Sequence, residues 1–134
     1  MKKSKRLHIA LWVAQSLLAA AFLMAGMMKI TVPIDELATN GMSFVYSFPE
    51  SMVRFIGICE VLGSIGLILP ALLRIKPILT PIASVGLAAI MVFAAIYHIT
   101  HNEPPIPNII LLGLASFIAW GRFSKEPILP KIKE

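Results

Sequence analysis

A glutamate lies near the middle of an otherwise apolar stretch, residues 55–70, and this is the first place where chemistry is expected. A charged side chain at the centre of a bilayer costs about 2.5–3.5 kcal/mol on insertion scales. Burial favours the protonated acid unless a cation approaches, and Lys29 and His98 are the cations within reach. We therefore expect Glu60 to point into the protein interior, toward Lys29 and His98.

The elements that must position Glu60 are membrane-spanning helices. The chain has 134 residues, of which 57% are hydrophobic and 14% charged, whereas a soluble domain carries about 25% charged residues. A helix needs about 20 apolar residues to cross the hydrocarbon. Four apolar runs predict an all-α integral membrane four-helix bundle that forms one domain over residues 1–134. The expected helices cover about 7–30, 52–73, 78–100 and 106–120, with an outer loop over 31–51 and a loose cytoplasmic tail over 122–134.

Basic residues predict the topology of this bundle. Ten of the 12 lysines and arginines flank the runs on one side: Lys2, Lys3, Lys5, Arg6, Arg74, Lys76, Arg122, Lys125, Lys131 and Lys133. The positive-inside rule then places both termini in the cytoplasm, and the protein in the plasma membrane as a multi-pass protein. The net charge of +5 is thus explained by topology, and no nucleic-acid partner is expected. The first run is too long for a signal-peptide core of about 7–15 residues, so we expect it to be retained.

Depth along the helices predicts where a site lies. At about 1.5 Å per residue, Glu60 is roughly 12 Å below the outer end of its helix, and Gln15 is close to mid-membrane. Lys29, His98 and Asn108 lie within about one turn of the outer ends of their helices. This arrangement predicts a polar pocket in the outer half of the bundle. Its candidate ligand-binding residues are Glu60, His98, Lys29, Gln15 and Asn108.

Each of these residues also has a structural interpretation. Lys29 is equally consistent with an anchor that extends its ammonium toward the interface. Gln15 is consistent with a hydrogen bond between helices, and Asn108 with the completion of a helix start. Glu60 itself is consistent with a structural polar contact.

The sequence gives little support for a disulfide, a metal or haem site, or a catalytic triad. The only cysteine, Cys59, excludes an intrachain disulfide and a cysteine metal site. His98 and His101 are three residues apart, but no second histidine pair accompanies them, which argues against haem and metal. Phosphate-binding loops and nucleophile–histidine–acid patterns are not apparent. The sequence therefore assigns no catalytic residue and identifies no cofactor.

Two spaced motifs resemble the DoxX/DoxX-like family of four-helix membrane proteins. They are Phe22-x-x-x-Gly26-x-x-Lys29 and Ile56-Gly-x-x-Glu60-x-x-Gly63-x-x-Gly66, and the resemblance covers about residues 7–122. It implies a four-helix bundle, and it marks Lys29, Glu60 and His98 as family-pattern positions without assigning their roles. The family takes its name from the small subunit of a thiosulfate:quinone oxidoreductase. Other members are linked to membrane oxidoreductase complexes, and an animal branch resembling them assists receptor assembly.

Two classes of function follow and stay open. In the first, the pocket binds a small amphipathic molecule such as a quinone, and the chain is a subunit of a membrane redox complex rather than a stand-alone enzyme. In the second, the protein is a non-catalytic assembly factor or chaperone-like scaffold whose polar residues are structural or contact a partner. The expected partners are the lipid bilayer, the amphipathic ligand, a membrane or redox protein, or a second copy of the chain.

Overall fold

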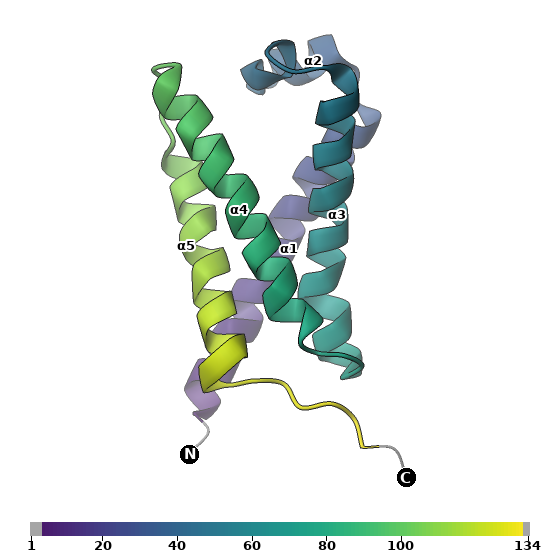
Figure 1. Cartoon of the computed structure of the whole chain (residues 1–134), viewed down its shortest axis with the longest axis vertical. Coiled ribbons are helices and arrows are strands. Elements are labelled where there is room, and N and C mark those ends of the chain that lie inside the picture. Colours follow the sequence, from purple (N-terminus) through teal and green to yellow (C-terminus); the bar gives the residue numbers. More distant parts are fainter. Residues whose placement is uncertain (1–3, 133–134) are drawn as a thin grey trace.

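Four long helices build the part of the protein that the computed structural model describes, residues 4–132 (Figure 1). They are α1 (Lys5–Thr31), α3 (Glu50–Leu73), α4 (Leu79–Thr100) and α5 (Ile106–Trp120). Each is long and apolar enough to cross a membrane, α5 together with the turn that follows it, over Ile106–Lys125. The helix bounds lie within two residues of the predicted ones. The predicted four-helix membrane fold is therefore confirmed.

The first and last of the described residues, Ser4 and Ile132, lie at the same end of the bundle, and the long loop after α1 lies at the opposite end (Figure 1). We call these the termini end and the outer-loop end. This arrangement agrees with four spans, since an even number returns the chain to its starting side. Of the charged residues used to predict the topology, Lys2, Lys3 and Lys133 lie outside the described residues.

Local sequence explains where the helices begin and end. The hydroxyl of Ser4 caps α1 by accepting from the backbone N–H of Leu7 at 3.2 Å. Pro49 precedes α3, and α3 ends at Arg74, whose φ of 57° is left-handed and stops the helix. Pro70 lies inside α3; membrane helices tolerate proline where neighbouring groups satisfy the freed carbonyl.

The outer loop is folded. It holds a short helix, α2 (Ile34–Thr39), and a single 3-10 turn, η1 (Ser43–Tyr46). Leu37, Val45 and Val53 are buried together and attach the loop to the first turn of α3. The chain between α1 and α3 thus forms a cover over the outer-loop end (Figure 1).

Glycines set how closely the helices approach. A Cβ on Gly26 of α1 would lie 2.7 Å from the carbonyl oxygen of Gly57 in α3, so the two backbones touch there. In the other half of α3, a Cβ on Gly63 would lie 2.7 Å from the Leu87 side chain of α4. Small residues permit this kind of close contact between membrane helices. Consequently α3 contacts α1 toward the outer-loop end and α4 toward the termini end.

The outside of the bundle is apolar, as a lipid-facing surface requires. Large side chains such as Leu17, Phe55 and Phe93 are 60%, 63% and 74% exposed. Soluble monomers rarely expose contiguous apolar patches of more than a few hundred Å². Exposed apolar residues occur on all four spans, so the lipid chains are the natural partner of this surface.

The predicted loose tail is wrong for the part that the structure describes. Residues Gly121–Lys125 form a π-helical turn, and Arg122 and Glu126 are only 2% and 4% exposed. The following segment crosses the termini end and is held there, because the backbone N–H of Lys131 donates to the carbonyl of Arg74 at 2.9 Å. Hydrophobicity could not reveal this, since the contacts are polar and lie far apart in the chain. Residues 133 and 134 of the predicted tail lie outside the described range.

Candidate functional site

Glu60 and Lys29 form a buried ion pair between α3 and α1. The Nζ atom of Lys29 lies 2.5 Å from Oε1 of Glu60. The two residues are 8% and 1% exposed. The prediction that Glu60 points inward and pairs with Lys29 is therefore confirmed.

The close contact of the two helices makes this pair. Gly26 precedes Lys29 by three residues, and Gly57 precedes Glu60 by three, so each glycine lies on the same helix face as its charged neighbour. The backbone contact between the glycines brings the two side chains within bonding distance. Both sequence motifs place a glycine three residues before the charged residue. In the structure the two glycines form one contact between α1 and α3, and the two charged residues pair beside it.

The pair leaves hydrogen-bonding capacity unused. Oε2 of Glu60 is buried and has no hydrogen-bond partner among the described residues. The ammonium of Lys29 can donate three hydrogen bonds. Among residues 4–132 it bonds to Glu60 and lies 5.8 Å from the ring centre of Phe44. A carboxylate oxygen without a partner is costly in a buried site. The site can therefore accept one further hydrogen bond and donate others.

The outer-loop cover closes over this pair. Phe44 belongs to η1, and its ring meets Tyr97 of α4 edge-on at 6.4 Å. Phe48 lies 5.8 Å from the ring of Tyr97. Arg54 of α3 donates to the carbonyls of Lys29 and Val32, at 2.9 and 2.6 Å, which satisfies the last turn of α1. An aromatic cluster and a capped helix end therefore surround the ammonium.

His98 takes part in a different interaction from the one predicted. Its Nδ1 lies 2.8 Å from Oε2 of Glu103, in the turn between α4 and α5, and it forms no bond to Glu60. The Ser43 hydroxyl also donates to Glu103, at 3.0 Å. These hydrogen bonds, from His98 first and Ser43 second, lower the pKa of the Glu103 carboxyl. The predicted approach of His98 to Glu60 is wrong, because a nearer acid in the loop binds the imidazole.

Asn108 and Gln15 both have partners in the protein. Asn108 donates to the sulfur of Met91 at 3.7 Å, a weak bond between α5 and α4. Gln15 uses both ends of its amide: Nε2 donates to the carbonyl of Leu67 at 2.7 Å, and Oε1 accepts from Arg122. The structural interpretation of Gln15 is therefore the one that the geometry supports.

Arg122 is the polar residue that sequence reasoning missed. Its Nε donates to Oε1 of Gln15 at 2.7 Å, and its Nη1 donates to the backbone carbonyl of Glu126 at 2.9 Å and lies 3.1 Å from Nδ1 of His8. Its guanidinium carbon also lies 5.7 Å from the ring centre of Trp12. We call these residues the Arg122 network.

The π-helical turn and one glycine place Arg122 inside the bundle. The wide turn is closed by the N–H of Glu126 donating to the carbonyl of Gly121 at 2.7 Å. A Cβ on Gly121 would lie 2.5 Å from Leu11 of α1, so the turn packs directly on that helix. The available signal was Gln15: an amide near mid-membrane requires a polar partner, and Arg122 is the basic residue nearest the end of the last span.

The Arg122 network lies beside a cavity of about 520 Å³ at the termini end. Neither Lys29 nor Glu60 lines it. Among residues 4–132 no group of three histidine, cysteine, aspartate or glutamate side chains is placed to hold a metal ion. Among the described residues, buried charged side chains thus lie in two separate regions of the bundle, one toward each end.

Comparison with known proteins gives one match. The family model described as "DoxX-like family" matches residues 13–121, which include the whole of α3 and α4. The chain has no significant match among curated proteins or among solved structures.

Proposed function

The chain belongs to the DoxX-like family, and we propose that this multi-pass membrane protein binds the polar head of a small amphipathic molecule at the Lys29–Glu60 pair. The observation that carries the proposal is the buried Oε2 of Glu60, which lacks a partner beside an ammonium with unused donors. A ligand that supplies one donor and one acceptor removes the cost of that unpaired oxygen.

The chemistry of the pair selects the class of head group. Lys29 would donate to a carbonyl or other acceptor, and Oε2 of Glu60 would accept from a hydroxyl. A quinone and its hydroquinone present these two groups on one ring. The aromatic cluster of Phe44, Phe48 and Tyr97 beside the ammonium suits a flat ring. We propose a molecule of this kind as the ligand, with the protein acting as a subunit of a membrane redox complex.

The proposed site is narrower than the set of residues predicted from the sequence. Lys29 and Glu60 are its centre, and His98, whose side chain is 20% exposed, lies near its outer edge through the shared contact with Tyr97. Gln15 is fully used in bonds to Leu67 and Arg122, so we leave it out. Asn108 contacts Met91 and is retained only as a neighbour.

Two variants of Glu60 test the proposal. Glu60→Gln keeps the shape of the side chain and an acceptor for Lys29, so the melting temperature in detergent should fall by much less than in Glu60→Leu, which removes the acceptor as well as the charge. Binding of a short-chain quinone, followed by native mass spectrometry, should weaken by about tenfold or more, because a hydrogen bond to a charged group contributes about 1.5–3 kcal/mol. Glu36→Gln, which removes an exposed acid in α2, is the matched control and should leave binding unchanged. Unaltered quinone binding by Glu60→Gln would overturn the proposal.

A second function is supported by a separate observation. The backbone contact between Gly26 and Gly57 holds α1 and α3 together beside the ion pair. This is expected if the pair only fixes the two helices to each other in a non-catalytic scaffold, a role that we call a polar lock. In that case Glu60→Gln is silent in every ligand assay, and the main effect is a loss of stability, largest in Glu60→Leu, which leaves Lys29 without a hydrogen-bond acceptor. The two variants therefore separate a ligand site from a lock.

We further propose that the termini end faces the cytoplasm of a plasma membrane. Arg74, Lys76, Lys125 and Lys131 support this through the positive-inside rule. Thr39→Cys, in a Cys59→Ala background, places one thiol at the end of α2. An impermeant maleimide should label it in intact cells. Labelling that requires permeabilised cells would reverse the orientation.

A further inference from the structure

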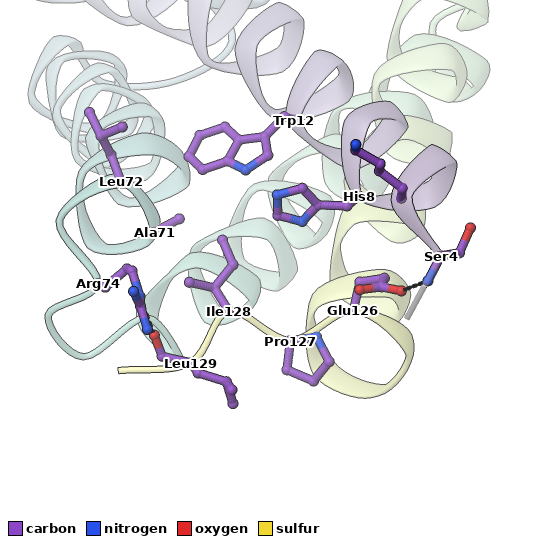
Figure 2. A pocket seen from close by; sticks show the side chains of 11 residues that line it. Ser4, His8, Trp12, Ala71, Leu72, Arg74, Glu126, Pro127, Ile128 and Leu129 are labelled. Atoms are coloured by element: carbon purple, nitrogen blue, oxygen red, sulfur yellow. Dashed lines mark hydrogen bonds between the residues drawn. The ribbon is translucent and has the colours of Figure 1, made fainter. Parts of the chain in front are cut away.

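The cavity at the termini end is formed by three separate parts of the chain (Figure 2). His8 and Trp12 extend from the first turns of α1, and Ala71 and Leu72 belong to the last turn of α3. The segment after the π-helical turn Gly121–Lys125 closes the cavity from below. Its volume of about 520 Å³ is in the range of small-molecule sites. The tail that sequence analysis took to be loose is thus one of its walls.

The polar part of the lining is mainly basic. Lys5 and Arg74 contribute positive side chains, and His8 contributes an imidazole. Among the described residues the one acid in the lining is Glu126, whose carboxylate accepts a hydrogen bond from the backbone N–H of Ser4 (Figure 2). Arg74 donates from Nε to the carbonyl of Leu129 at 2.9 Å and from Nη2 to the carbonyl of Pro130 at 3.4 Å, which leaves its Nη1 for an incoming ligand. Lys5 and Nη1 of Arg74 are therefore the donors that the cavity offers to an anion.

A third cation lies directly behind the lining. Arg122 is 2% exposed, and its Nη1 is 3.1 Å from the imidazole of His8. Its Nη2 is buried and has no hydrogen-bond partner among residues 4–132. The buried guanidinium therefore adds a positive field to this side of the cavity, and solvent screens that field weakly.

The rest of the lining is apolar. Trp12, Ala71 and Leu72 line the side toward the bundle, and Ile128 of the C-terminal segment lines the opposite side (Figure 2). Tryptophan is enriched at the boundary between hydrocarbon and water, and this cavity lies where α1 begins and α3 ends. The cavity consequently combines cations with apolar side chains at a helix end, where a membrane boundary is expected.

We propose that this cavity binds the phosphate group of an anionic phospholipid from the leaflet at the termini end. Lys5 and Arg74 contact the phosphate, and Trp12 and Leu72 pack against the start of an acyl chain. A free phosphate compound would satisfy the cations but leave the apolar lining uncovered. The position at the membrane boundary and the mixed cationic and apolar lining favour the lipid. This binding is independent of the proposed Lys29–Glu60 site.

Lys5→Glu is the cleanest test because Lys5 is exposed and its ammonium has no hydrogen bond or ion pair among residues 4–132. It is the first residue of α1, where an acidic side chain favours the helix dipole, so the fold is retained. Phosphatidylglycerol is titrated into the full-length protein in detergent, and the first bound lipid is followed by native mass spectrometry. We expect its affinity to fall by about 25-fold, since each charge near an anionic lipid contributes about fivefold and two units change.

Lys125→Glu is the matched control, because it reverses an exposed lysine at the same end that does not line the cavity. Its effect on phosphatidylglycerol binding should be less than about threefold, because Lys125 does not line the cavity and salt screens its charge over the longer distance to the bound phosphate. Glu60→Gln should leave lipid binding unchanged, so failure here is separate from failure of the proposed function.

Three outcomes would overturn the proposal. Equal losses in Lys5→Glu and Lys125→Glu would show general attraction to the basic end. Equal binding of phosphatidylcholine and phosphatidylglycerol by the natural chain would show that the cavity does not select anionic lipid. Displacement of the lipid by millimolar glycerol phosphate would assign the site to a soluble phosphate compound instead.

Discussion

The Lys29–Glu60 pair and the Arg122 network hold charge inside the same bundle by different means. In the pair, one ammonium contacts one carboxylate at 2.5 Å across a single helix contact, and the charges cancel. In the network, one guanidinium is surrounded by an amide, an imidazole, a carbonyl and an indole ring, and the Glu126 carboxylate is only near it. The first charge is neutralised by an opposite charge, and the second is solvated mainly by dipoles.

This difference predicts how each region responds to change. In a neutralised pair, the attraction between the two charges offsets the free energy that each charge costs when it is buried. Removing one partner therefore destabilises the protein, whereas removing both is tolerated. A guanidinium solvated by several dipoles has no single partner whose removal compensates for its loss. The pair also connects only α1 and α3, whereas the network connects α1 to the turn after α5 and, through Gln15, to α3.

The largest effect is expected from breaking the pair on one side. Glu60→Leu leaves the ammonium of Lys29 buried without an opposite charge, and we expect a loss of about 3–5 kcal/mol in unfolding free energy. Combining it with Lys29→Met should recover most of that loss, because both charges are then absent. Reversible unfolding in mixed micelles, with a double-mutant cycle, measures both values. Additive losses would show that the two residues do not act as a neutralised pair.

A similar loss is expected from separating the helices that carry the pair. Gly57→Leu places a Cβ 2.8 Å from the carbonyl oxygen of Gly26, and a backbone atom cannot move aside as a side chain can. We expect destabilisation of about 3 kcal/mol. Gly86→Leu is the control, since a Cβ there meets no atom within 4 Å. Thermal melts that fall equally for both variants would mean that the Gly26–Gly57 contact does not hold α1 against α3.

The Arg122 network should be less sensitive, but its loss should not be rescued. Arg122→Leu removes the donor to Gln15 and to the carbonyl of Glu126, and we expect a cost of about 2 kcal/mol. Adding Gln15→Leu should not restore stability, because the carbonyl of Leu67 then also loses its donor. Lys125→Leu, at an exposed neighbouring position, gives the baseline in the same unfolding assay. If the double variant regains the full stability of the natural chain, Arg122 and Gln15 compensate each other as Lys29 and Glu60 do, and the expected difference between the two regions is wrong.

The smallest effect concerns the polar contact at the outer-loop end. The pKa of Glu103 is lowered in the folded protein by bonds from His98 and Ser43. A lowered folded pKa contributes stability that is present above the unfolded value of 4.5 and is lost as the pH falls through the folded value. The melting temperature should therefore fall in acid by slightly more for the natural chain than for Glu103→Gln. If the melting temperatures of the two proteins change equally with pH, the ionised Glu103 carboxylate does not contribute to stability.

Much of the fold was predictable because the bilayer limits the choices. Apolar runs of about 20 residues predict spans, and the bounds of α3, α4 and α5 agree with the predicted ones within two residues. Glu60 was identifiable for the same reason, since an acid stands out where almost every neighbour is apolar. Arg122 was not identifiable in this way. A basic residue after the last span is also what the positive-inside rule expects.

The sequence by itself determined the spans, the bias of charge between the two sides and the presence of a costly acid in α3. Those properties depend on composition and on local spacing, which the chain carries before it folds. Only the tertiary structure decided which cation neutralises Glu60, that His98 binds Glu103, and that Arg122 turns inward beneath a folded tail. These outcomes depend on how closely particular helices approach. That distance is set by backbone contacts such as Gly26–Gly57 and Gly121–Leu11, between residues that lie far apart in the chain.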